Sequence, residues 1–163
     1  MNDRARTAGH FQLRARHVGI VVSDISRALH FYRDLLGLEV ITDLIEEGEF
    51  IDNLVGLTGA RLETYKLAAP NDEFVIELME VTSHPNQAGN PRFDDIGTSH
   101  IAFEVDDIDR LYTSLSENGV RFCGEAASSP FDPAKSVFAL DPDGTMVQFV
   151  EFEVEGYFYN KER

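Results

Sequence analysis

Cysteine, basic side chains and long apolar runs are all scarce in this sequence. The single cysteine, Cys123, excludes a disulfide within the chain and fits a reducing compartment. Only 14 Lys and Arg residues stand against 29 Asp and Glu, and the net charge of −15 argues against nucleic acid or an anionic membrane as a partner. No apolar run approaches the roughly 20 residues of a membrane span, and residues 1–16 lack the apolar stretch of a signal peptide. We therefore expect a cytoplasmic protein with no nucleic-acid and no membrane partner.

What the sequence does contain is an internal repeat. HVGIVVSDISR begins at His17 and HIAFEVDDIDR begins at His100, so that a histidine, a strand-like run, an acidic turn and Ile-x-Arg recur at a constant offset of 83 residues. Two later segments, 76–81 and 147–152, match at an offset of 71, which pairs Glu77 with Gln148. Such a repeat predicts two similar modules. If the modules pack face to face, the two histidines come together.

Turn residues and apolar periodicity divide the chain into five parts. These are a loose N-terminal arm (1–14), a first module (15–81), a linker (82–98), a second module (99–153) and a C-terminal tail (154–163). The fold class expected is α+β, with two tandem βαβββ modules. We predict strands over 17–22, 38–44, 60–68, 74–81, 99–105, 120–125, 136–140 and 145–153, helices over 24–36 and 107–118, and a loop over 45–59 with a helical turn at 52–55.

Strand alternation places the matched polar residues on one face of each module. His17 lies on the face opposite the apolar residues that the helix should cover. Alternation places Glu77, His100 and Gln148 on the face that the helices do not cover as well. The small residues Gly19 and Ala102, two positions beyond the histidines, would leave room for a bound group. Two imidazoles, a carboxylate and an amide oxygen form a plausible shell for Zn, Fe, Mn, Co or Ni, with two positions left for water or substrate.

These motifs resemble the vicinal oxygen chelate superfamily, which includes glyoxalase I, methylmalonyl-CoA epimerase, extradiol dioxygenases and fosfomycin and bleomycin resistance proteins. The similar stretches are HVGIVVSDISRALHFYRDLLGLEV, FVIELMEV, SHIAFEVDDIDRLYTSLSENGV and DPDGTMVQFVEFE. The resemblance implies a half-open mixed β-barrel around one divalent metal ion, commonly in a homodimer. It places the four metal ligands on His17, Glu77, His100 and Gln148.

The last ligand position departs from the family pattern, because that position is usually glutamate and this sequence has Gln148. A neutral amide cannot accept a proton as that glutamate is thought to do, which puts glutathione-specific glyoxalase activity in doubt. Glu77 is therefore the expected catalytic base. Glu47, Glu49 and Glu104 are second candidates for the base, and each is more simply explained as an ordinary exposed acid.

Three functions follow from the resemblance. The first is isomerase, epimerase or lyase chemistry on a small oxygen-chelating substrate through an enolate-like intermediate, with the metal as Lewis acid and Glu77 moving the proton. The second is a non-heme Fe(II) extradiol-type dioxygenase, which would use His17, His100 and Glu77, although its carboxylate normally comes from the last strand. The third is a non-catalytic small-molecule binding or resistance protein, which the intact ligand set disfavours.

Several remaining residues have simpler interpretations. His10, His30 and His84 have no counterpart in the repeat and are expected at the surface or in packing, and Cys123 is expected to be structural. The tail carries three aromatic residues, Tyr157, Phe158 and Tyr159, which we expect to cover a neighbouring surface or another subunit.

Overall fold

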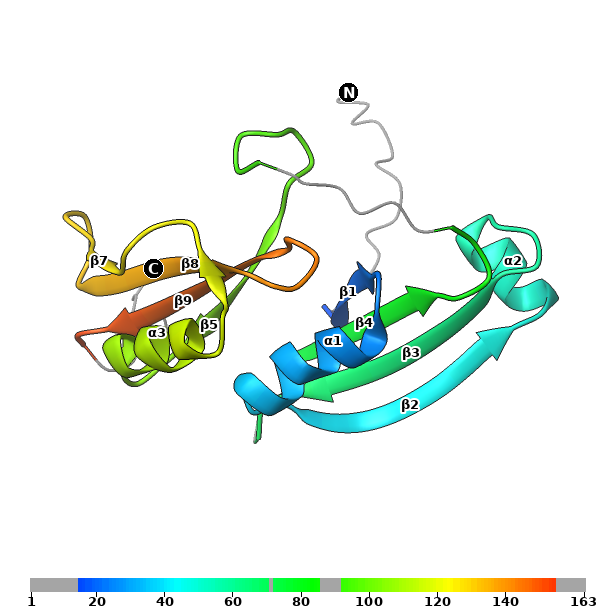
Figure 1. The fold of residues 1–163 in the computed structure, drawn as a ribbon, viewed down its shortest axis with the longest axis horizontal. Coiled ribbons are helices and arrows are strands. Elements are labelled where there is room, and N and C mark those ends of the chain that lie inside the picture. The colour runs from blue at the N-terminus through cyan, green and yellow to red at the C-terminus, as the bar shows by residue number, and fades with distance from the viewer. Residues whose placement is uncertain (1–14, 71, 86–91, 155–163) are drawn as a thin grey trace, which may run out of the picture.

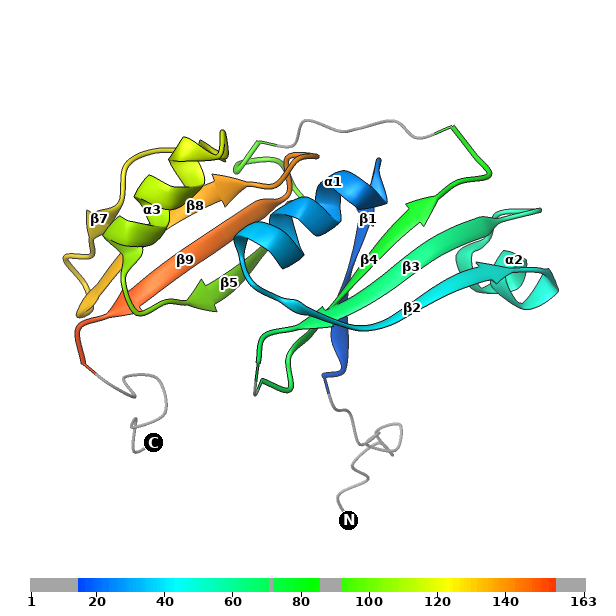
Figure 2. The ribbon, with the colours of Figure 1, turned by 60° about the horizontal axis from the view of Figure 1, so that its bottom comes forward.

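The computed structural model describes residues 15–70, 72–85 and 92–154. Two mixed β-sheets lie side by side, each with its main helix packed against it (Figures 1 and 2). The N-terminal arm, part of the linker and the aromatic residues of the tail lie outside the described residues, so the expectations for those segments remain predictions. None of the described helices is long and apolar enough to cross a membrane.

The first module contains a four-stranded sheet in the order β1-β4-β3-β2. Strand β1 pairs in parallel with β4, and the other two pairings are antiparallel. Its elements are β1 (His17–Val22), α1 (Ile25–Leu29), the π-helix η1 (His30–Leu35), β2 (Glu39–Glu47), α2 (Glu49–Val55), β3 (Arg61–Ala68) and β4 (Val75–Val81).

The second module repeats this arrangement in the order β5-β9-β8-β6, with the short strand β7 paired to β8. Strand β5 is parallel to β9, as β1 is to β4. Its elements are β5 (His100–Glu104), α3 (Ile108–Glu117), β6 (Arg121–Phe122), β7 (Ala127–Ser128), β8 (Ala134–Leu140) and β9 (Met146–Phe152). The predicted α+β fold with two βαβββ-like modules is confirmed.

Both main helices begin in the same way, which explains why the acidic turn and the Ile-x-Arg pattern are repeated. The side chain of Asp24 accepts a hydrogen bond from the backbone N–H of Arg27 at 3.0 Å. In the second module Asp107 accepts from the N–H of Arg110 at 2.9 Å. Each aspartate thus satisfies a free N–H of the first helical turn.

One hydrophobic core joins the two modules. Side chains from the helix-facing side of both sheets and from both helices form a single buried cluster, including Ile20, Tyr32, Leu78, Ile108 and Phe149. A second, smaller cluster of Ile51, Ala60 and Leu62 lies under α2, on the opposite face of the first sheet. The helix-facing sides are therefore buried within the chain, whereas most of each opposite face is not covered by a helix.

Several predicted boundaries were wrong, and two have a clear physical reason. The segment predicted as loop over 45–59 continues β2 to Glu47, because β2 pairs with β3. It then forms α2 from Glu49, which includes the helical turn predicted at 52–55 and begins three residues earlier. The strand predicted over 120–125 shortens to Arg121–Phe122, since only these residues pair with β8. The first helix changes to π-helical geometry at His30, which helical spacing alone does not predict.

Candidate metal-binding and catalytic site

His17 and Glu77 meet on the exposed face of the first sheet. Strand β4 lies beside β1, with Gly19 opposite Glu77, and the imidazole Nε2 of His17 lies 2.9 Å from Oε2 of Glu77. Both side chains are partly buried, with 31% of His17 and 12% of Glu77 exposed to solvent. On the other face of β1, Ile20 and Val22 are buried in the core. The predicted orientation of both residues is confirmed.

The distance between these two atoms matches that expected for two ligands of one metal ion. Imidazole nitrogen and carboxylate oxygen bind such metals at about 2.1 Å, so two ligands at right angles lie about 3.0 Å apart. Glu77 and His17 also supply the nitrogen and oxygen donors that Zn, Fe, Mn, Co and Ni accept. The donor types and the spacing of this half of the predicted shell are thus compatible with a metal ion.

The other carboxylate oxygen of Glu77 has a partner that the sequence did not indicate. The ammonium of Lys66 lies 2.9 Å from Oε1, and Lys66 is directly opposite Glu77 in the pairing of β3 with β4. The Lys66 side chain is 25% exposed. Nothing in the repeat pointed to Lys66, because the equivalent position of the second module carries a phenylalanine.

The second sheet has the same arrangement with different side chains. Ala102 lies opposite Gln148, as Gly19 lies opposite Glu77, and His100 precedes Ala102 by two residues, as His17 precedes Gly19. Gln148 and Ala102 line a cavity of about 340 Å³. The two modules therefore present two half-sites, which we define as His17, Glu77 and Lys66 on the first sheet and His100, Gln148 and Phe138 on the second.

One chain does not bring the two half-sites together. Among the described residues, no three His, Cys, Asp or Glu side chains are close enough to share a metal ion. The face of the first half-site is left open, since Val21 is 60% exposed and Leu44 is 45% exposed on it. The half-open barrel around one metal ion is thus not formed by the two modules of a single chain.

The space predicted beside the histidines is only partly present. A Cβ atom added to Gly19 would lie 2.9 Å from the terminal methyl of Met79, a flexible side chain. Ala102 remains exposed and lines the cavity next to Gln148.

The alternative candidates lie away from the first half-site or have other partners. Glu47 forms an exposed ion pair with Arg61, and Glu49 lies in the first turn of α2. Glu104 is exposed and lines a different cavity, of about 450 Å³, between the sheets. His30 forms an ion pair with Asp34 on the surface, and His84 forms a hydrogen bond with Ser83. Cys123 is exposed.

Glu80 and Glu151 lie on the helix-facing sides of β4 and β9, and each has a structural role that the repeat pattern alone did not indicate. Glu80 accepts a hydrogen bond from the N–H of Ile25 at 2.8 Å, and Glu151 accepts from the N–H of Ile108 at 2.9 Å. Each carboxylate therefore stabilises the N-terminus of the helix packed on its sheet. The offset of 71 between Glu80 and Glu151 was the available signal. This contact confirms that Glu151 and Gln148 lie on opposite faces of β9.

The two modules are joined on the helix side by a network around the β8–β9 turn. The buried hydroxyl of Tyr32 donates to Asp141 at 3.0 Å, and Arg27 and Ser23 bond to Asp143. Burial raises the pKa of Asp141, while hydrogen bonds from Thr145, Tyr32 and Asp143 oppose that rise. Burial and the nearby Asp141 raise the pKa of Tyr32 well above its ordinary value.

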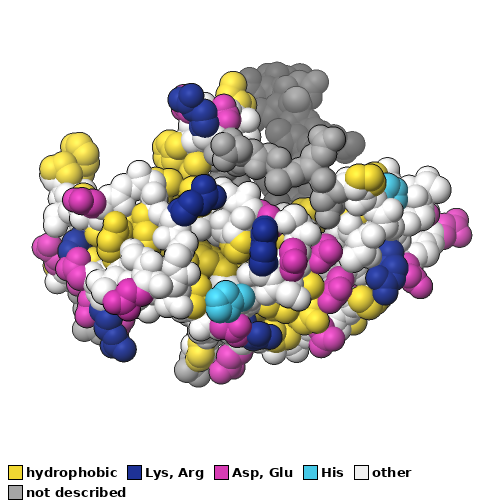
Figure 3. Space-filling view, in the orientation of Figure 1, with side chains coloured by type: hydrophobic (Ala, Val, Ile, Leu, Met, Phe, Trp, Pro, Cys, Tyr) yellow, Lys and Arg dark blue, Asp and Glu magenta, His cyan; other side chains and the backbone are white. Residues whose placement is uncertain are grey.

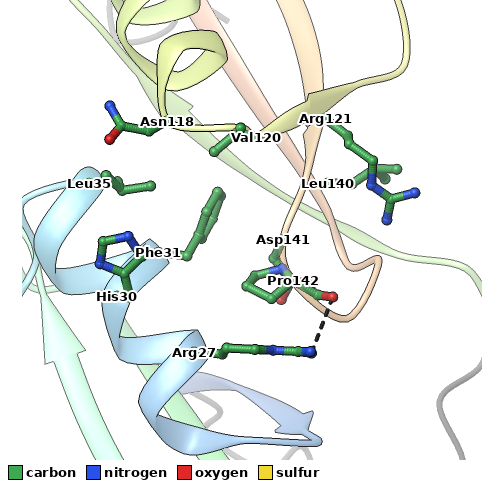
Figure 4. Close-up of a pocket in the computed structure, with 11 residues that line it drawn as sticks. Arg27, His30, Phe31, Leu35, Asn118, Val120, Arg121, Leu140, Asp141 and Pro142 are labelled. Atoms are coloured by element: carbon green, nitrogen blue, oxygen red, sulfur yellow. Dashed lines mark hydrogen bonds between the residues drawn. The ribbon is translucent and has the colours of Figure 1, made fainter.

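A cavity of about 290 Å³ lies beside this network, between α1 and the second module. Figure 4 shows Phe31 pointing into it from η1, with Arg27 bonded to the carbonyl of Pro142 at its edge. The space-filling view of the same side shows basic side chains and a histidine around apolar surface between the modules (Figure 3). Because these residues hold the modules in their side-by-side arrangement, they determine where the two half-sites face.

Known proteins share this architecture. The family model described as the Glyoxalase/Bleomycin resistance protein/Dioxygenase superfamily matches residues 14–149. The chain belongs to this superfamily. Its fold is similar to that of a glyoxalase family protein from Bacillus cereus, with a TM-score of 0.80 and 24% identity, over 90% of this chain and 98% of that one.

Two relatives, one from Escherichia coli and one from Schizosaccharomyces pombe, match most of this chain. The uncharacterized protein YaeR of Escherichia coli K12 is 28% identical over 85% of this chain and 95% of its own length. A lactoylglutathione lyase of Schizosaccharomyces pombe is 26% identical over 90% of this chain, which spans only 50% of that relative.

Proposed function

We propose that this protein is a metal-dependent isomerase, epimerase or lyase that binds a small substrate through two adjacent oxygens. The observation that carries the proposal is the contact of 2.9 Å between His17 and Glu77, together with the identical strand register around His100 and Gln148. A bound divalent ion would act as a Lewis acid and stabilise negative charge on the substrate oxygens. The four residues supply the nitrogen and oxygen donors that such an ion requires.

The site is assembled by two copies of the chain in a homodimer. Each copy offers one half-site on each of its two exposed sheet faces, so a second copy can place its His100 and Gln148 opposite the first copy's His17 and Glu77. The exposure of Val21 and Leu44 supports this arrangement, because a second copy packed on this face would remove their apolar surface from water. A twofold-symmetric pair would form two equivalent sites. Two facing sheets would also complete the half-open barrel.

Glu77 moves the proton in this reaction. It is the single carboxylate of the four, and its Oε2 faces His17 while its Oε1 is held by Lys66. We infer that it removes a proton from the substrate carbon next to the chelating oxygens and returns it to that carbon or a neighbouring atom. Gln148 orients the substrate or completes the shell but cannot accept a proton, so we do not propose the glutathione-dependent reaction of the lyase relatives.

Metal analysis of protein purified without chelator tests the binding site. We expect about one transition-metal ion per chain, lost in His17→Ala and in His100→Ala and kept in the surface control His30→Ala. Circular dichroism would verify that each variant is folded. A folded double variant of His17 and His100 with the metal content of the wild type would overturn the site.

Hydrogen exchange tests the reaction class once the metal is known. The metal-loaded protein, in deuterated water, should exchange the carbon-bound proton of a member of a panel of 2-oxo acids, 2-hydroxy acids and 2-hydroxy ketones. Glu77→Gln should abolish the exchange, whereas the surface control Glu117→Gln, at the end of α3, should not. Oxygen consumption without exchange would favour the dioxygenase alternative.

A further inference from the structure

The two half-sites differ at one equivalent position, and the difference points to the kind of substrate. Lys66 lies opposite Glu77 in the first sheet, and Phe138 lies opposite Gln148 in the second. Both half-sites have the same strand register, and their side chains differ at this position and at the position of Glu77 and Gln148. One half-site is therefore charged and the other aromatic.

The charge of the first half-site favours an anion. Lys66 and Glu77 balance each other at 2.9 Å, and ligand histidines and Gln148 are neutral. The six half-site residues themselves therefore carry no net negative charge to match a divalent metal ion. The Lys66 ammonium has three N–H donors and contacts one oxygen of Glu77, so it can offer a further donor on the same partly buried face. An ammonium in such a place binds a carboxylate through charge-assisted hydrogen bonds.

The second half-site presents aromatic surface beside its ligands. The rings of His100 and Phe138 meet edge to face with centroids 5.2 Å apart, and Phe93 extends the row with its centroid 5.5 Å from that of Phe138. Phe93 is 66% exposed, so its ring offers a free surface. Asp132 also lines the cavity next to Gln148, but it precedes β8, and Ala134 and Ser136 separate it along the chain from Phe138. The acid therefore does not interrupt the row of rings.

We propose that Lys66 and the row formed by Phe93 and Phe138 select a small carboxylate that carries a flat apolar group next to its chelating oxygens. This inference deepens the proposed function and rests on it, since it requires both half-sites to face one substrate. Lys66 binds the carboxylate and the two phenylalanine rings pack against the flat group. Lys66 is thus a specificity-determining residue.

Three compounds separate the two contributions. Mandelate carries a carboxylate, an adjacent hydroxyl and a ring; lactate lacks the ring, and 1-phenylethane-1,2-diol lacks the carboxylate. Calorimetric titration into the protein loaded with Mn²⁺ should rank mandelate first. Lys66→Gln should weaken mandelate binding about tenfold or more and leave the diol unchanged, because one charged hydrogen bond is lost. Phe93→Ala should weaken mandelate and leave lactate unchanged, while the control Lys135→Gln should alter none of the three.

Mn²⁺ affinity, measured in the same variants, separates this role from a structural one. Lys66→Gln should bind Mn²⁺ as tightly as the wild type or more tightly, because the competing ammonium beside Glu77 is gone. If it lowered both Mn²⁺ and mandelate affinity, Lys66 would merely hold Glu77 in place and the inference would be wrong. If the wild type binds Mn²⁺ but does not prefer mandelate, the inference fails and the proposed function stands. If the wild type binds no metal, both fail.

Discussion

Replacing Tyr32 with phenylalanine tests how the two modules are held together. The hydroxyl of Tyr32 is buried and donates to the carboxylate of Asp141, which is itself only 2% exposed. The other oxygen of Asp141 already accepts from the N–H groups of Asp143 and Thr145 at 2.9 Å and 2.7 Å. Tyr32→Phe therefore leaves a buried carboxylate oxygen without its donor. We expect the free energy of unfolding to fall by about 1.5–3 kcal/mol, the range for a hydrogen bond to a charged group.

The loss should depend on pH in a defined direction. Burial raises the folded-state pKa of Asp141, and the Tyr32 hydroxyl opposes this by stabilising the ionised form. A carboxyl whose folded pKa is raised favours folding at low pH, and this contribution is lost as the pH rises through the folded pKa. Tyr32→Phe raises that pKa further. The destabilisation should thus be largest near neutral pH and shrink toward the ordinary pKa of aspartic acid.

Urea unfolding of chelator-treated protein at about pH 7.5 and about pH 4.5 would measure this difference, with metal binding removed from the comparison. Tyr112→Phe is the matched control, since the ring of Tyr112 packs against that of Phe122 within the second module. We expect the control to cost less than about 0.5 kcal/mol at both pH values. A Tyr32→Phe effect below that value, or one that does not change with pH, would refute the account of this junction.

Four further outcomes are expected, for Gln148, Glu151, catechol oxidation and Gly19. Gln148→Glu should keep or tighten metal binding, because a carboxylate adds charge attraction at the same oxygen. Glu151→Gln should leave the metal content unchanged. It should lower the stability measured by calorimetry by about 0.5–1 kcal/mol, because it weakens the contact with the N–H of Ile108 at the start of α3. Loss of metal in Glu151→Gln but not in Gln148→Ala would mean that the register of β9 is wrong. Catechol with Fe(II) should cause little uptake at an oxygen electrode, since the carboxylate lies on β4 rather than β9, and rapid uptake with ring cleavage would contradict this. Gly19→Ala should reduce stability by less than about 1 kcal/mol in urea unfolding, because only the mobile end of Met79 must move; a larger loss would show that Met79 is fixed.

Much of the fold could be predicted because local and global signals agree in this chain. The repeated histidine, acidic turn and Ile-x-Arg identify the first strand and helix of each module, and the contacts of Asp24 and Asp107 show why these residues are needed. Strand alternation also gave the correct faces, because the helix-facing sides are apolar and buried. The extension of β2 could not be predicted in this way, since its pairing with β3 depends on residues distant in the sequence.

The candidate site was only partly predictable. Repeat offsets and alternation put His17 and Glu77 on the same face of the first module, and the structure shows that they are in contact at 2.9 Å. They could not indicate Lys66, because it reaches Glu77 from a neighbouring strand and has no equivalent in the second module. They also could not indicate how the modules are packed. That packing depends on contacts such as Tyr32 with Asp141, which join residues far apart in the chain.

The claim that two copies share each metal site can be tested by combining two inactive variants. Chains with His17→Ala and chains with His100→Ala would carry different affinity tags, be coexpressed, and be purified over both tags, so that only mixed assemblies remain. In a shared-site homodimer, one of the two sites of the mixed pair takes both substitutions and the other takes neither. Each variant purified singly should hold no metal, and the mixed pair should hold about half of the wild-type content per chain. A mixed pair without metal would contradict the shared site, and so would a double-tag purification that yields no mixed pair.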